Sequence, residues 1–255
     1  MTQAASYVSE RRLVALACRV LAIEGLAETT LGHVSLRVDG THLLVRARRA
    51  SEHGLLFTTA DDIALTDLDG NLHPGEPPIS LPAELPIHTA LLRSRPDCAA
   101  VVHAHSPAVV ACTVTDVPLR PIIGAYNVPA MRLAADGIPT YRFSGLIRTA
   151  ERAAGLLQAM GDRPACLLRG HGLAATGGSL AAAVLAAIDV HVLARLTVTC
   201  WQMQRPLAEI VSDDIEGRLG GFQPIDDLAG QLAGDGVGTA RTGVDMQHDH
   251  HNTSR

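Results

Sequence analysis

Strand-like and helix-like segments alternate along the chain from residue 8 to about residue 202, and no linker separates them. The segments HVSLRV and THLLVRA flank the pair Asp39-Gly40, which favours a tight hairpin turn because glycine readily adopts positive φ. Each helix-like segment has a single apolar face that must be buried against another element. Elements interleaved in this way predict one α/β domain with a mixed sheet and helices on both faces.

The remaining elements are expected from apolar spacing and from capping residues. Apolar positions at helical spacing, with Ser, Thr or Pro near the start, predict helices over residues 8–26, 82–94, 107–115, 150–160 and 179–202. Strands are also expected in LLFTT (55–59), IALTD (63–67), CAAVVHAH (98–105), IPTYRF (138–143) and PACLLRGHG (164–172), the last ending in a glycine-flanked turn.

Charge and composition exclude several classes of partner. The formal net charge is -5 and no long basic run occurs, so neither nucleic acid nor an anionic membrane is an expected partner. The richest apolar segment, residues 179–196, contains Asp189, His191 and Arg195, and the N-terminal stretch lacks the plan of a signal peptide. The five cysteines are dispersed without a CxxC spacing, which is typical of buried thiols in a reducing compartment. We therefore expect a cytoplasmic globular protein.

The end of the chain differs in composition from the rest. Beyond about residue 229 it is rich in Gly, Asp and Thr and ends in QHDHHNTSR. We expect a single domain over residues 1–228 and a flexible tail over residues 229–255. The tail histidines would bind metal weakly and would interfere with any metal assay.

Two histidines stand in a segment that otherwise reads as core. His103 and His105 are two residues apart, so they share one face of a strand. Burying an unpaired imidazole costs free energy. The pair is therefore either hydrogen-bonded within the core or arranged to hold a metal ion.

Two further segments supply residues of the same chemical type. Glu84 lies in the first turn of a predicted helix, and His171 lies between two glycines directly after a predicted strand. Three imidazoles and a carboxylate would suit zinc, manganese, iron or cobalt, which such ligands discriminate poorly. Each residue alone has a plainer explanation, as a turn donor or a solvated first-turn acid. His88 shares the helix face of Glu84 and is either a hydrogen-bond partner behind the site or ordinary packing.

The chain resembles the class II aldolase/adducin family over roughly residues 8–205. Two segments carry the resemblance, LPAELPIHTALLRSRPDCAAVVHAHSPAVVACTV and LLRGHGLAATG. The resemblance implies a three-layer α/β/α fold with a central mixed, largely antiparallel sheet. It also implies a homotetramer with active sites at subunit interfaces. By position, it makes His103, His105 and His171 metal ligands and Glu84 the fourth ligand, the acid/base, or both in turn. Tyr126 stands near the position of a proton-donating tyrosine of the aldolases.

The phosphate-binding stretches of the family's sugar-phosphate aldolases are altered here. Those enzymes use an Asn in G-N-x-S, a T-G pair and an S-S pair before the Glu. This chain has His33 at the Asn position, Thr59-Ala60 for the second pair and Pro82-Ala83 for the third. A phosphate dianion would lose most of its neutral donors, which disfavours sugar-phosphate cleavage.

What remains resembles the decarboxylase branch of the family, which acts on hydroxy-aromatic carboxylates such as 3,4-dihydroxyphthalate. A metal acting as a Lewis acid on a phenolic oxygen would stabilise a keto-like tautomer, and Glu84 or Tyr126 would deliver the proton. We expect His33, Ser35 and Arg49 to bind substrate, with Arg48 and Arg37 as alternatives for the carboxylate fork. For each of Arg37, Arg48 and Arg49, an exposed strand position with no role in binding is an equally good explanation.

Other functions stay open at this stage. One is retro-aldol cleavage of a sugar phosphate or another hydroxy-carbonyl substrate, or a related iron-dependent oxygenation. A non-catalytic, adducin-like interaction module is disfavoured, because such domains generally lose the metal histidines and this chain keeps all three.

Overall fold

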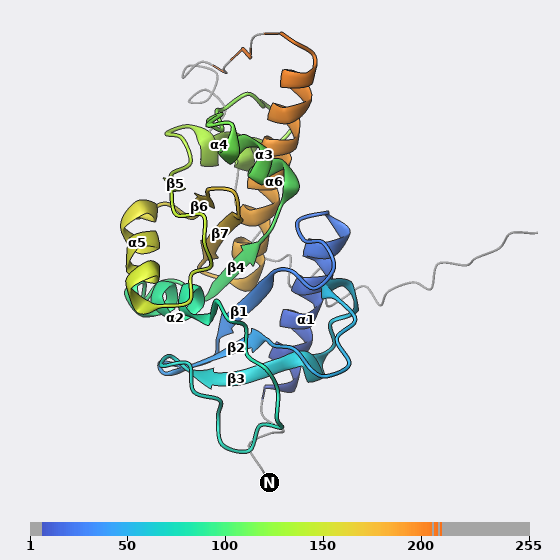
Figure 1. Ribbon diagram of the computed structural model, residues 1–255, viewed down its shortest axis with the longest axis vertical. Coiled ribbons are helices and arrows are strands. Elements are labelled where there is room, and N and C mark those ends of the chain that lie inside the picture. The colour runs from blue at the N-terminus through green and yellow to red at the C-terminus, as the bar shows by residue number, and fades with distance from the viewer. Residues whose placement is uncertain (1–6, 206, 209, 211–255) are drawn as a thin grey trace, which may run out of the picture. The chain divides into compact units, whose positions relative to one another are not determined.

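A seven-stranded mixed sheet is the central element of the fold (Figure 1). The computed structural model describes residues 7–205, 207–208 and 210. The strand order is β3-β2-β1-β4-β7-β6-β5, and every neighbouring pair is antiparallel except β5 and β6. The strands are β1 (His33–Arg37), β2 (His42–Arg46), β3 (Ile63–Asp67), β4 (Ala100–Ala104), β5 (Thr140–Tyr141), β6 (Ala165–Leu168) and β7 (Gly172–Gly177).

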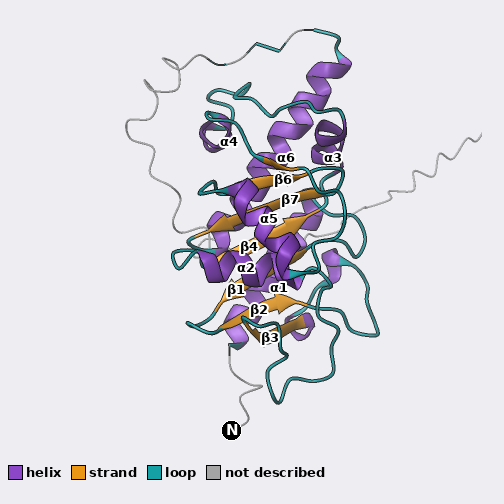
Figure 2. Ribbon diagram, turned by 60° about the vertical axis from the view of Figure 1, so that its left-hand side comes forward, coloured by secondary structure: helices purple, strands orange, loops and turns teal. Residues whose placement is uncertain are grey.

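Helices cover both faces of this sheet, and each face has its own apolar core (Figure 2). One core includes residues of α1 (Val8–Ile23), α3 (Pro107–Val114), α4 (Val128–Ala134) and α6 (Leu180–Gln202). The other includes residues of α2 (Leu85–Ser94) and α5 (Ala150–Met160). The expected three-layer α/β/α class with a largely antiparallel sheet is confirmed.

Alternation along the strands decides which polar residues meet. Val34 and Val102 belong to the core beneath α1 and α6, whereas Val101 belongs to the core beneath α2 and α5. Odd-numbered residues of β1 and β4 therefore face α2, because side chains alternate along a strand. His33 pairs with His103 across the two strands. The sheet thus gathers its buried histidines on the α2 face.

Three expected boundaries need correction. The LLFTT segment is not a strand: Gly54, at φ 95°, turns the chain into a 3-10 helix, η2 (Leu55–Phe57), of which only Leu55 is buried. The first helix ends at Ile23 rather than near residue 26, because Gly25 takes positive φ. α2 begins at Leu85, so Glu84 is its N-cap residue and not a first-turn residue.

One strand and one α-helix were not expected from the sequence. The GLAATG segment forms β7, which pairs with β4 on one side and β6 on the other. The predicted strand over 164–172 thus becomes a hairpin in which residues 169–171 form the turn between β6 and β7. α4 was likewise not predicted, and the expected strand over 138–143 shortens to β5.

α6 is long and apolar enough to cross a membrane by length and composition alone. Its residues Val184, Val190 and Leu193 are buried in the core with β4 and β7, as in the core helix of a globular protein. The described residues all belong to one compact unit. The tail expected over residues 229–255, with its histidines, lies outside the described residues and stays a prediction.

Candidate metal centre

Four residues from three separate segments converge at one end of β4. Glu84 caps α2, His103 lies in β4, His105 directly follows β4, and His171 lies in the β6–β7 turn. One ligand atom from each lies within 4.8 Å of the others. All are buried except His105, which is partly exposed. The structure thus brings together the four residues that the sequence analysis grouped.

The two strand histidines are oriented by the backbone. His103 Nδ1 lies 2.9 Å from the carbonyl oxygen of Leu173, to which it donates its proton, so Nε2 keeps its lone pair. His105 Nε2 lies 2.9 Å from His103 Nε2. Burial, together with the neighbouring imidazoles, lowers the pKa of His105 to about 3. Neutral rings with converging lone pairs are the form in which histidine binds a transition metal.

His171 gives the clearest indication that this cluster suits a metal ion. Neither of its ring nitrogens has a hydrogen-bond partner among the described residues, and both are shielded from solvent. A buried nitrogen without a partner costs free energy unless an ion or water completes it. The residues present therefore fit a divalent metal.

Gly172 holds His171 in place. A Cβ atom built on Gly172 would lie 2.1 Å from the carbonyl oxygen of Ala104, so only glycine allows β7 to start this close to the end of β4. Gly170, on the other side of His171, has φ of 62°. The two glycines explain why His171 can lie close to His103 and His105 at the end of β4.

The two carboxylate oxygens of Glu84 have different neighbours: one binds the backbone and the other faces the histidines. Oε1 accepts the backbone N–H of Ile147 at 2.7 Å, and Oε2 lies 3.4 Å from Nε2 of both His103 and His171. Burial alone would raise the pKa of Glu84, but the adjacent imidazoles of His103 and His171 and the hydrogen bond from the Ile147 N–H bring this pKa well below its usual range. Glu84 is therefore ionised, as a metal ligand must be.

A pocket of about 340 Å³ opens beside this cluster, and Glu84 and His105 form part of its wall. Arg48 and Arg148 line it, as do the apolar residues Leu31 and Leu146. Arg148 was not singled out from the sequence. The chemistry of the wall suits a flat, anionic ligand next to a metal.

The residues expected to bind substrate divide into two groups. His33 lines the pocket. Ser35 does not: it is fully buried, and its Oγ lies 2.6 Å from His88 Nδ1. Arg49 lies near Asp61 and Asp62 instead of lining the pocket, and its place there is taken by Arg48.

Two further candidates lie away from the pocket. Tyr126 is 77% exposed and is not part of the wall in the single chain. Arg37 donates to the backbone carbonyl oxygens of Cys98 and Leu92, which explains it as a structural residue. Neither residue reaches the cluster within this chain.

His33 is supported from behind by His88. His33 Nδ1 lies 2.7 Å from His88 Nε2, and both rings are buried. Burial lowers the pKa of His88 to about 3 and brings the pKa of His33 well below 6.5. Both rings are therefore neutral. Of the two explanations of His88 that the sequence left open, the structure favours the hydrogen-bond partner.

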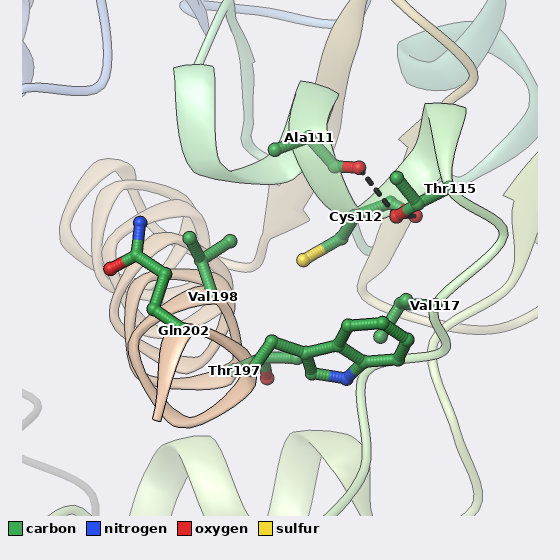
Figure 3. A pocket seen from close by; sticks show the side chains of 8 residues that line it. Ala111, Cys112, Thr115, Val117, Thr197, Val198 and Gln202 are labelled. Carbon is green, nitrogen blue, oxygen red and sulfur yellow. Dashed lines mark hydrogen bonds between the residues drawn. The ribbon is translucent and has the colours of Figure 1, made fainter. Parts of the chain in front are cut away.

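A second hollow, of about 260 Å³, lies between α3 and the end of α6 (Figure 3). Its wall consists of Ala111, Cys112, Thr115, Val117, Thr197, Val198, Trp201 and Gln202. It contains no histidine or carboxylate, so it offers neither a transition-metal site nor an acid/base pair. Among the described residues, the cluster on the α2 face is the group of histidines and carboxylates that could hold a metal ion.

The fold and the cluster can now be compared with known proteins. A family model described as "Class II Aldolase and Adducin N-terminal domain" matches residues 12–198. The chain belongs to this family. Among solved members of the fold, an aldolase II superfamily protein from Pseudomonas syringae has a TM-score of 0.71 at 22% identity, covering 84% of this chain and 83% of that one. L-fuculose-1-phosphate aldolase from Thermus thermophilus has a TM-score of 0.63 at 23% identity, covering 78% and 100%.

Curated members of the class II aldolase/adducin family include more similar sequences. The 3,4-dihydroxyphthalate decarboxylase of Arthrobacter keyseri is 49% identical, with 82% of this chain and 86% of that protein covered. Its counterpart in Terrabacter sp. is 46% identical, with 82% and 88% covered. The L-fuculose phosphate aldolase of Escherichia coli K12 is 30% identical, with 75% and 83% covered. Enzymes of both names are lyases, and these relatives indicate carbon-carbon bond cleavage for this chain.

Proposed function

We propose that the protein is a metal-dependent, non-oxidative decarboxylase of a hydroxy-aromatic carboxylate of the 3,4-dihydroxyphthalate class, acting in aromatic catabolism. The observation that carries the proposal is the 49% identity to a 3,4-dihydroxyphthalate decarboxylase over most of both chains. Aldolases among the relatives reach 34% identity, in the 5-methylthioribulose-1-phosphate/5-deoxyribulose-1-phosphate aldolase of Rhodospirillum rubrum.

The pocket wall supports this substrate class. Pro82 and Ala83, which stand where the sugar-phosphate aldolases keep a serine pair, line the pocket without offering a side-chain hydroxyl. Arg48 and Arg148 offer guanidinium forks, which bind carboxylates with two parallel hydrogen bonds. Leu31 and Leu146 provide apolar surface for an aromatic ring.

His103, His105, His171 and Glu84 would hold the metal, which we propose to be zinc, manganese, iron or cobalt. When bound, the ion supplies Lewis-acid polarisation of a substrate oxygen. The rest of the chemistry falls to side chains of the chain itself.

In the proposed reaction, the carbon-carbon bond to one carboxylate breaks and carbon dioxide leaves. The electron pair of that bond remains on the ring carbon, which must receive one proton. The ionised Glu84 carboxylate, in the wall of the pocket, would accept the phenolic proton of the substrate and deliver it to the ring carbon, and Tyr126 is the alternative donor. The arginines would hold the remaining carboxylate, so that only one of the two substituents is aligned for departure.

We further propose a homotetramer with active sites at subunit interfaces, located in the cytoplasm. Tyr126 is exposed on its own chain, and a neighbouring subunit's pocket would give it a function. Cys18, Cys98, Cys112 and Cys166 are free and buried, which suits a reducing compartment. Light scattering that finds a fully active monomer would contradict the assembly.

In the deciding experiment, the metal-loaded enzyme is incubated with 3,4-dihydroxyphthalate and, in separate reactions, with L-fuculose 1-phosphate and with ribulose phosphates. Released carbon dioxide and aldehyde are measured in each case. We expect carbon dioxide from the aromatic acid and no aldehyde from the sugar phosphates. The opposite pattern would make the chain an aldolase.

A further inference from the structure

Behind the pocket, three buried polar side chains form a continuous hydrogen-bonded chain. Ser35 Oγ lies 2.6 Å from His88 Nδ1, and His88 Nε2 lies 2.7 Å from His33 Nδ1. Ser35 and His33 share one face of β1, and His88 reaches between them from α2. Ser35 and His88 have no exposed surface, whereas His33 forms part of the pocket wall.

The direction of the hydrogen bonds in this chain follows from the partners of Ser35. Among the described residues, Ser35 Oγ has one hydrogen-bond partner, His88 Nδ1. If His88 donated to the serine, the serine hydroxyl proton would be left buried without an acceptor. A buried donor without a partner disfavours that arrangement by about tenfold or more. The serine therefore donates to His88 Nδ1.

The remaining protons then have fixed positions. A neutral imidazole carries one N–H, so His88, which accepts at Nδ1, carries its proton on Nε2. It donates that proton to His33 Nδ1, and His33 must carry its own proton on Nε2. Among the described residues, His33 Nε2 has no hydrogen-bond partner, and His33 is in the wall of the pocket. The free N–H is therefore available to a ligand.

We propose that Ser35 and His88 are positioning residues that fix His33 as an N–H donor toward a substrate oxygen, so that the pocket selects a carboxylate or phenolate oxygen at this position. Naming the substrate rests on the proposed function, whereas the proton positions do not depend on it. A histidine held in the opposite tautomer would present a lone pair and would repel the same oxygen. The serine thereby contributes to specificity without touching the substrate.

Neutron crystallography of the deuterated, zinc-loaded protein tests the proton positions directly. We expect deuterium on Ser35 Oγ, His88 Nε2 and His33 Nε2. Deuterium on His33 Nδ1 would overturn the proposal, whatever the enzyme turns over. If the proton positions are as expected but the enzyme does not convert 3,4-dihydroxyphthalate, the proposed function fails instead.

Kinetics with 3,4-dihydroxyphthalate then test the role of His88. His88→Met introduces an apolar side chain of similar volume and removes both nitrogens. We expect KM to rise about tenfold, the effect of one hydrogen bond to a charged acceptor. The zinc content should stay at the wild-type value, because His88 is not in the ligand cluster. His88→Gln restores a donor near the Nε2 position, and its KM should return to within about threefold of wild type.

Thr66→Val provides the matched control. Thr66 is fully buried in β3 of the same sheet, and its hydroxyl has no partner among the described residues. This variant should change neither KM nor the tautomer of His33. An unchanged KM in a folded, zinc-loaded His88→Met enzyme would show that His88 only fills space and would overturn the positioning role.

Discussion

Replacing Gly172 by alanine tests whether the close contact between β7 and β4 builds the metal centre. The new Cβ would lie 2.1 Å from the carbonyl oxygen of Ala104 and 3.0 Å from the Cα of His105. Non-bonded carbon and oxygen atoms rarely come closer than about 3 Å, so the two segments must separate by roughly 1 Å. Both clashing groups belong to the backbone, so no rotation of a side chain can relieve the overlap.

The separation would act on the ligands themselves. His171 precedes Gly172, and His105 follows Ala104, so the shift moves two of the four ligand residues apart. Displacements of about 1 Å cost on the order of 100-fold in activity, and disturbed ligand support costs about 10- to 100-fold in metal affinity. We expect Gly172→Ala to remain folded by circular dichroism but to bind zinc at least tenfold more weakly.

Competition with a chelator of known affinity measures this change, with elemental analysis as a check on stoichiometry. Gly178→Ala is the control, because a Cβ there meets only the carbonyl oxygen of Asp97, at 3.6 Å, an ordinary contact. Wild-type zinc affinity and turnover in Gly172→Ala would refute the view that this approach positions the ligands.

Further predictions concern the charged groups. Glu84→Gln should keep much of its metal, because three imidazoles remain, but kcat should fall by about 10²–10⁴-fold; wild-type turnover would remove Glu84 from the chemistry. Arg148→Gln should raise KM for 3,4-dihydroxyphthalate by about 10-fold or more, whereas the exposed Arg142→Gln should not; equal effects would remove Arg148 from recognition. Burial raises the pKa of Asp189 to about 6, so its ionisation destabilises the folded state as pH rises from about 4 to above 6. Asp189→Asn should therefore gain up to about 3 kcal/mol near pH 8 and nothing near pH 4, as thermal unfolding at both pH values will show.

The sequence was sufficient to predict the hairpin and the shared face of the two histidines, since both rest on local spacing. Asp39-Gly40 specifies a turn within its own neighbourhood, and a two-residue separation places His103 and His105 on one face wherever the strand lies. The resemblance to the family then connected Glu84 and His171 to this pair. The hairpin and the histidine pair need no knowledge of distant contacts, whereas the four-residue group came only from the resemblance.

The elements that escaped prediction depend on contacts across the fold. β7 consists largely of small residues and is buried on both faces, so neither alternation nor β-branched side chains marks it as a strand. Arg148 reaches the pocket because the N–H of Ile147 binds Glu84 Oε1, across 63 residues of sequence. Ser35 was expected to bind substrate, and only the position of α2 shows that its hydroxyl is hydrogen-bonded to His88 instead.

The origin of the ligands in three separate segments has a consequence for folding. An ion held jointly by the start of α2, the end of β4 and the β6–β7 turn would act as a cross-link between parts of the chain that are far apart in the unfolded state. Because the assembled ligand set exists only in the folded state, binding free energy becomes folding free energy. Chelation should therefore lower the unfolding temperature in proportion to the logarithm of free metal concentration, and metal supply in the cell would set the lifetime of the protein as well as its activity.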